Sequence, residues 1–111
     1  MIEAYIRPER LQAVKDALEV MGIKGMSISQ VKGHGAQGGI KLAGRAGSYN
    51  VEFIDKVKLE ICVDGDTDLE AIINHIADAA RTGKPGDGKI FVLPIDDAIR
   101  IRTMERGESV C

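Results

Sequence analysis

A basic, glycine-rich stretch at residues 81–89 has the composition best suited to binding an anion. It reads Arg81-Thr82-Gly83-Lys84-Pro85-Gly86-Asp87-Gly88-Lys89. Three glycines within six residues allow backbone N–H groups to turn toward one point, which is how a loop forms a nest for an anion. Lys89 adds a positive charge at the end of the loop. We therefore expect this stretch to bind phosphate.

The stretch differs from the phosphate loop of nucleotide hydrolases. Residues 83–89 nearly match the motif GxxxxGK[ST], but Ile90 stands where the motif needs a hydroxyl to hold magnesium. The order of elements also differs, because the pattern predicts a helix before this loop and a strand after it. We expect a loop that binds nucleotide without hydrolysing it.

Two arginines follow within the segment Ile99-Arg100-Ile101-Arg102, whose alternation predicts a short strand. Side chains two residues apart on a strand lie on the same face, so both guanidinium groups could grip one set of phosphate oxygens. Each charged hydrogen bond of this kind is worth about 1.5–3 kcal/mol. Such arginines on a strand are most often solvent-facing partners of carboxylates. The nearby glycine loop and Lys89 favour phosphate binding instead.

Alternating and helical patterns predict the elements that position these groups. Strands are expected at residues 2–6, 26–32, 57–63 and 90–93, and helices at residues 8–21 and 67–80. Residues 67–70 have the composition of a capping box, and the run at 90–93 is apolar on both faces, which predicts a central strand. The order predicts an α+β fold of the ferredoxin-like, split βαβ type, βαββαβ. Its helices would cover one face of the sheet, and we expect a partner subunit to cover the other.

A long connection separates the two halves of this pattern. Residues 33–47 contain six glycines and the basic residues Lys41 and Arg45, with no apolar period. Connections longer than about 12–15 residues are uncommon in compact domains and are usually functional or disordered. We expect a functional loop here.

Composition sets further limits on the class of protein. A chain of 111 residues is expected to form a single domain over residues 1–111. A net charge of −2 and 4% aromatic residues disfavour direct nucleic-acid binding. No apolar run approaches 18 residues and no charged leader precedes one, so we expect a cytoplasmic protein.

The cysteines and histidines show no spacing typical of a metal site. Cys62 lies in a predicted strand and Cys111 is the final residue, so we expect free thiols rather than a disulfide. His34 and His75 have no carboxylate or cysteine at ligand spacing, and we expect His75 to face water.

Through four segments taken together, the sequence resembles the PII signal-transduction proteins, and the resemblance runs over nearly the whole chain. The four segments are Gly33-His34-Gly35-Ala36-Gln37, residues 82–89, the strand that begins Ile90-Phe91-Val92, and Ile99-Arg100-Ile101-Arg102-Thr103. The resemblance implies a homotrimer with three clefts between subunits, each binding ATP or ADP. It also implies that ATP with Mg²⁺ permits 2-oxoglutarate to bind, which makes a sensor of energy and nitrogen state and not an enzyme.

The resemblance also implies a role for each matching residue. The nucleotide phosphates would contact the loop of one subunit, the arginines of its neighbour and the start of the long loop: Gly86, Asp87, Gly88 and Lys89; Arg100 and Arg102; Gly35, Ala36 and Gln37. Ser27, Glu60 and Cys62 would line the adenine end, although Glu60 could simply balance Lys58. Gln37 would join the Mg²⁺ shell and contact 2-oxoglutarate, whose distal carboxylate would pair with Lys56. Ala36 replaces a frequent arginine and Cys62 a frequent valine.

In the family, the long loop is the partner-binding T-loop, here at about residues 35–53, while the nucleotide-binding loop is at about 81–89 and the C-terminal segment at 103–111. Arg45 matches an arginine that enters ammonium channels in some members, and Tyr49 matches a tyrosine that many bacterial members have uridylylated. The surrounding Gly44-Arg45-Ala46-Gly47-Ser48-Tyr49 departs from the usual Tyr-Arg-Gly-Ala-Glu-Tyr, and Ser48 is an alternative site of modification. An ammonium transporter, which would recruit the protein to the membrane, or a nitrogen-assimilation enzyme is the implied target.

Two other functions are compatible with the pattern. One is a small nucleotide phosphohydrolase that uses Lys89 and Arg100, although no evident general base or nucleophile lies beside them in the sequence. The other is a PII-like paralogue that senses adenyl nucleotide alone to control another transporter or enzyme. Gln37 and Lys56 argue against the paralogue.

Overall fold

A computed structural model describes residues 1–33 and 54–111. The described elements are β1 (Ile2–Ile6), the 3-10 turn η1 (Pro8–Arg10), α1 (Leu11–Val20), β2 (Ser27–Gly33), β3 (Ile54–Ile61), α2 (Leu69–Ala80), β4 (Gly88–Val92) and the 3-10 turn η2 (Glu108–Val110). The strands form one sheet in the order β2-β3-β1-β4, and every neighbouring pair is antiparallel. Because β3 lies between β1 and β2, the first half is a split βαβ unit, as the sequence predicts.

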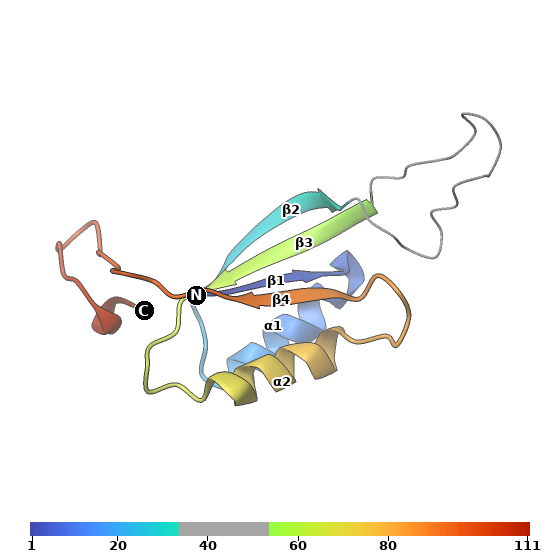
Figure 1. Cartoon of the computed structure of the whole chain (residues 1–111), viewed down its shortest axis with the longest axis horizontal. Helices are drawn as coiled ribbons and strands as arrows, with labels where there is room; N and C mark the ends of the chain where they lie inside the picture. Colours follow the sequence, from blue (N-terminus) through green and yellow to red (C-terminus); the bar gives the residue numbers. More distant parts are fainter. Residues whose placement is uncertain (34–53) are drawn as a thin grey trace.

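Both helices pack against one face of the sheet, and no described helix or strand covers the other, which we call the open face (Figure 1). Alternate residues of β1 and β3 point toward the helices and are almost fully buried, as the burial pattern of β1 shows. The core they form with the helices consists of Ile2, Ala4, Ile6, Val14, Leu18, Val57, Leu59, Ile61, Ile72, Ile76 and Ala80. Burying each larger aliphatic side chain stabilises the fold by roughly 1.5–3 kcal/mol.

The helix ends follow local chemistry. Gly22, with a φ of +82°, comes directly after the C-terminal cap of α1, a position where glycine commonly ends a helix. At the start of α2 the cap is Asp68, whose carboxylate accepts a hydrogen bond of 3.1 Å from the Ala71 N–H. The predicted cap residue, Thr67, instead donates its hydroxyl to Asp64 at 2.7 Å. The capping box therefore does not form as predicted, and the helix is capped one residue later.

The prediction of a central strand at residues 90–93 is wrong. β4 is an edge strand that pairs with β1, and Phe91 and Val92 remain 47% and 50% exposed. Ile90 packs against the core, whereas Val92 on the same face and Phe91 on the opposite face stay about half exposed, so the described residues cover this apolar run only in part. Apolar residues on both faces of a strand indicate that both faces are buried, but not that the covering atoms belong to the same chain.

The predicted strand at residues 99–102 is also wrong. Residues 98–107 form a hairpin in which the Arg100 N–H donates to the Glu105 carbonyl at 2.9 Å and the Gly107 N–H to the Ala98 carbonyl at 3.0 Å. Only an isolated bridge joins Ile99 to Arg106. The alternation of apolar and charged residues in this segment does not mark a buried face, because Ile101 is 93% exposed. Arg100 and Arg102 thus do not share the face of one strand.

The expectation of free thiols is wrong as well. Cys62, just after β3, and Cys111, the last residue, form a disulfide with Cα atoms 5.1 Å apart. That separation lies within the usual range for a disulfide. The hairpin and η2 return the chain end to the end of β3 (Figure 1), which the spacing of the two cysteines does not reveal.

His75 is exposed, as expected, and its Nδ1 lies 2.7 Å from the Ala71 carbonyl oxygen. Of the helices in the part of the chain that the structure describes, none has the length and apolar character needed to cross a membrane.

The core predicts how α1 responds to truncation. Leu18→Ala removes a fully buried side chain, whereas Val20→Ala changes a residue of the same helix that is 84% exposed. We expect Leu18→Ala to lower the free energy of unfolding by about 2–5 kcal/mol, because it loses burial and leaves a cavity. Val20→Ala should stay within about 0.5 kcal/mol. Urea titration followed by circular dichroism measures both, and equal losses would contradict the assigned core.

Candidate functional site

The loop between α2 and β4 is organised by the Asp87 carboxylate. It accepts hydrogen bonds from the Thr82 and Gly83 N–H groups, both at 2.9 Å, and from the Thr82 hydroxyl. These hydrogen bonds hold the pKa of Asp87 far below its usual range, and the bond from the Thr82 hydroxyl has the largest effect. The carboxylate therefore stays ionised at neutral pH and closes residues 82–87 into one turn.

Two cations attach this loop to the sheet. Arg7, directly after β1, donates from Nε to Asp87 at 3.1 Å and from Nη2 to the Pro85 carbonyl at 2.7 Å. Lys56, in β3, donates from Nζ to the Gly86 carbonyl. The loop is thus fixed from two neighbouring strands at the end of the sheet where β1 ends.

Lys56 is a charged side chain in the interior, only 8% exposed. Burial chiefly, and then the nearby Arg7 cation, lower its pKa, while Glu9 and Asp87 raise it. Lys56 also lines a pocket of about 380 Å³, together with Pro8, Gln30, Val31, Lys32, Asp55 and Val57. A partly desolvated ammonium group beside such a pocket suits an incoming carboxylate.

Gly88 allows the loop to enter the sheet. Its φ is +110°, and a Cβ atom there would lie 1.7 Å from the Tyr5 carbonyl oxygen. Gly88 pairs with Ile6 at the start of the β1–β4 ladder, so any side chain would push the two strands apart. The glycine that the sequence suggested for an anion nest is therefore also needed for the strand pairing.

The predicted residues Ser27, Glu60 and Lys89 all lie on the open face of the sheet. Because Ile2, Ala4 and Ile6 face the helices, Glu3 and Tyr5 face the other way. The register pairs Ser27 with Glu60, Glu60 with Glu3, and Tyr5 with Lys89.

Glu60 already has a cationic neighbour. The Lys58 Nζ lies 3.8 Å from a carboxylate oxygen of Glu60, 3.8 Å from one of Glu3 and 5.9 Å from the centre of the Tyr5 ring. Glu60 therefore balances Lys58 in this structure, as the simpler interpretation of the sequence held. These charged side chains are partly buried, at 22–35% exposure, and lie on the sheet face that no described helix covers.

The predicted arginines lie at the other end of the sheet from the loop. The Leu93 N–H donates to the Met1 carbonyl at 2.8 Å, so the end of β4 lies beside the start of β1. The hairpin with Arg100 and Arg102 continues from there, beyond the end of the sheet opposite the 81–89 loop (Figure 1). Arg100 pairs with Glu105 at 3.2 Å. Within one chain the loop and the arginines are not brought together.

Several predicted site residues lie outside the described residues. They are in the segment 34–53 and comprise Gly35, Ala36, Gln37, Arg45 and Tyr49. In residues 1–33 and 54–111, no three His, Cys, Asp or Glu side chains are grouped so that they could hold a metal ion.

Arg7 is the site residue that sequence reasoning missed. Its signal is weak, because an arginine between a strand and Pro8 resembles any solvated strand end. Only the pairing of β1 with β4 places it beside Asp87. Asp87 itself was expected to contact nucleotide, but its carboxylate is directed to the loop's own N–H groups. It acts through the backbone that it orders.

The Asp87 contacts predict a variant with a clear pH signature. Asp87→Asn keeps the size of the side chain but removes the charge, so the melting temperature should fall at pH 7 and the 82–87 amides should exchange faster. Because the folded-state pKa is lowered, the ionised carboxylate stabilises the fold fully above about pH 4 and progressively less below it. The difference between wild type and variant should therefore shrink below pH 4.

The control for this variant is Asp78→Asn. Asp78 forms an ion pair with Arg81 at 3.4 Å, and its side chain is 76% exposed. Exposed pairs contribute little, so this change should leave the melting temperature nearly unaltered. Equal effects of the two variants would show that Asp87 does not order the loop.

Comparison with known proteins gives one consistent result. A family model described as "Nitrogen regulatory protein P-II" matches residues 1–105. Nitrogen regulatory protein P-II 1 of Methanothermobacter thermautotrophicus is 54% identical, over 96% of this chain and 91% of the relative. Nitrogen regulatory protein P-II of Cereibacter sphaeroides is 48% identical, over 96% of this chain and 95% of the relative.

Plant relatives and a solved structure agree. A P-II homolog of Arabidopsis thaliana is 50% identical over 96% of this chain, which spans 55% of that longer protein. A crystal structure of Arabidopsis thaliana PII bound to citrate superposes with a TM-score of 0.79 at 46% identity, covering 98% of this chain and 88% of the other. The relatives are named for regulation and not for catalysis. With relatives at about half identity matched along nearly its whole length, this chain belongs to the nitrogen regulatory protein P-II family.

Proposed function

We propose that this chain senses ATP or ADP together with 2-oxoglutarate and regulates targets of nitrogen metabolism. The observation that carries this proposal is the glycine loop fixed by Asp87 and Arg7, with the buried Lys56 amine directly beneath its backbone. A rigid, basic loop beside a buried cation can hold two anionic ligands next to each other. Membership of the P-II family supports the same function.

Nucleotide phosphates would bind at Gly86, Asp87, Gly88 and Lys89. Gly86 (φ +97°) and Gly88 (φ +110°) have backbone conformations that residues with a side chain rarely adopt. Lys89 is exposed at the end of the loop. Adenine would lie toward Ser27, Glu60 and Cys62. Gly35, Ala36 and Gln37 would complete the phosphate site, with Gln37 in the Mg²⁺ shell.

2-Oxoglutarate would bind through Lys56. The Nζ atom would exchange the Gly86 carbonyl for a carboxylate oxygen and gain a charged partner, which a partly desolvated ammonium group favours. The related PII of Arabidopsis thaliana was crystallised with citrate, another carboxylate ligand. Because Lys56 also holds the nucleotide loop, such a change would link the two ligands.

A homotrimer would complete the site. Arg100 and Arg102 lie at the wrong end of their own sheet, so they would have to reach the loop of a neighbouring subunit (Figure 1). The sheet edge formed by β4 offers a surface for this assembly, because large apolar residues along and beyond this strand are exposed: Phe91, Val92, Leu93 and Ile95. Covering them would add to the stability of the trimer.

Targets would be bound through the T-loop at about residues 35–53 of a single domain, 1–111. Arg45 would enter a partner such as an ammonium transporter, and Tyr49 is a candidate for modification. A nitrogen-assimilation enzyme is the other class of target. The protein would act in the cytoplasm and at the membrane when a transporter recruits it.

One observation favours a second candidate function. Lys56 already has a partner in the Gly86 carbonyl, so it could serve only to fix the loop. The chain would then be a paralogue that senses adenine nucleotide alone and controls another transporter or enzyme.

Calorimetric titration of 2-oxoglutarate with Mg²⁺, once with saturating ATP and once with ADP, tests the function. We expect heat with ATP and none with ADP. Lys56→Met should weaken 2-oxoglutarate binding at least about tenfold, because the carboxylate loses its charged partner. ATP binding should weaken by a smaller factor, because the loop loses its tie to Lys56 but keeps its contacts with Asp87 and Arg7. Lys24→Met, at an exposed position, should bind both ligands normally. No heat with either nucleotide, despite tight ATP binding, would establish the paralogue instead.

A further inference from the structure

The segment from Ala98 to Cys111 is tied to the rest of the chain chiefly by the disulfide. Its hydrogen bonds and ion pairs are internal or reach only as far as Asp97, for example Arg106 to Asp97 at 2.8 Å and the Cys111 N–H to the Glu108 carbonyl at 3.1 Å. Among the described residues, none of these polar contacts joins the segment to β1, β3 or either α-helix. The Cys62–Cys111 bond is therefore what fixes its place.

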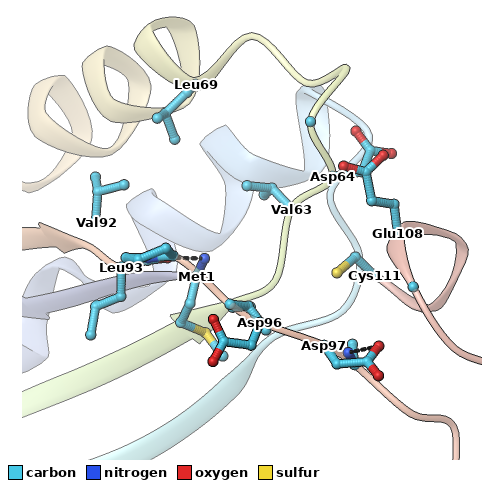
Figure 2. A pocket seen from close by; sticks show the side chains of 15 residues that line it. Met1, Val63, Asp64, Leu69, Val92, Leu93, Asp96, Asp97, Glu108 and Cys111 are labelled. Atoms are coloured by element: carbon cyan, nitrogen blue, oxygen red, sulfur yellow. Dashed lines mark hydrogen bonds between the residues drawn. The ribbon is translucent and has the colours of Figure 1, made fainter.

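The segment forms one wall of a pocket of about 410 Å³ at this end of the sheet (Figure 2). Met1, Val63 and Leu69 line one side, and Glu108 and Cys111 line the other. The pocket is open to water and only partly apolar, so its walls contribute little packing to hold the segment. Opening the disulfide would therefore leave few contacts to keep this wall closed.

We propose that Cys62 and Cys111 are a reversible thiol–disulfide site that sets the position of residues 98–111. A thiolate of one cysteine attacks a low-molecular-weight disulfide, RSSR, and releases RSH. The second thiolate then attacks the mixed disulfide and releases another RSH. Two protein thiols are oxidised to one disulfide while RSSR is reduced to two RSH, and the two thiol protons leave with the products. Cys111 is exposed and so accessible for the first attack.

The consequence for ligand binding rests on the proposed function. Arg100 and Arg102 are carried by this segment, and Cys62 stands at the proposed adenine end. The disulfide fixes where the hairpin that carries these arginines stands relative to its own sheet. The ion pair between Arg100 and Glu105 lies within that hairpin and does not depend on the disulfide. The two redox forms should therefore differ in ATP affinity, by a factor on the order of ten, a typical coupling between two sites.

The test uses the full chain equilibrated in buffers of reduced or oxidised glutathione. Mass spectrometry of a non-reduced digest should find the cross-linked Cys62–Cys111 peptides only in the oxidised buffer. Amide hydrogen exchange at Arg100, Met104 and Gly107 should be at least about tenfold faster in the reduced form, because the hairpin loses its tether. Cys111→Ser, a change at the exposed chain end, should show the fast exchange in both buffers, and so should Cys62→Ser.

Absence of the cross-linked peptides, or equal exchange in the two forms, would overturn the switch. ATP titration of both forms then tests its consequence: equal, tight affinities would overturn the link to nucleotide. Failure of both forms to bind ATP would refute the proposed function instead, and the exchange result would still decide whether the switch exists.

Discussion

The Asp87 carboxylate is the group on which the rest of the site depends. One side chain accepts from two backbone N–H groups, a hydroxyl and the Arg7 guanidinium, and so joins the loop to itself and to β1. Lys56 adds the tie to β3 through the Gly86 carbonyl. A glycine-rich loop would otherwise lose much conformational entropy on binding a ligand. Fixed in advance by these contacts, the loop can bind an anion without that loss.

The arrangement of the sheet separates the two halves of the proposed nucleotide site. β4 begins at the fixed loop and ends where the chain turns away toward the arginine hairpin, so one subunit presents the loop at one end and the arginines at the other (Figure 1). The same strand leaves apolar side chains exposed at the sheet edge. Assembly of identical subunits would bury these side chains and bring the complementary halves together.

The sequence predicts those features whose causes are local. Alternation at Ile2, Ala4 and Ile6 indicates a half-buried strand, and the glycines and lysines of residues 81–89 indicate an anion-binding loop. It does not reveal whether Phe91 is covered by its own chain or by another, because both arrangements select the same residue types. The alternation at residues 99–102 resembles a strand although it forms half of a hairpin. Contacts such as Arg7 with Asp87 and Cys62 with Cys111 depend on the tertiary fold and have no short-range signal.

The central claim, that each nucleotide site is shared between subunits, can be tested most directly by complementation. One chain would carry Lys89→Ala, which damages the loop, and the other Arg100→Ala with Arg102→Ala, which damages the arginine half. Each variant alone should bind ATP weakly. After the two are unfolded and refolded together, the mixed trimers should regain some sites with an intact loop and intact arginines, and tight ATP binding should return at a reduced number of sites. If mixing restores no tight binding, the site is formed within one chain and the account is wrong.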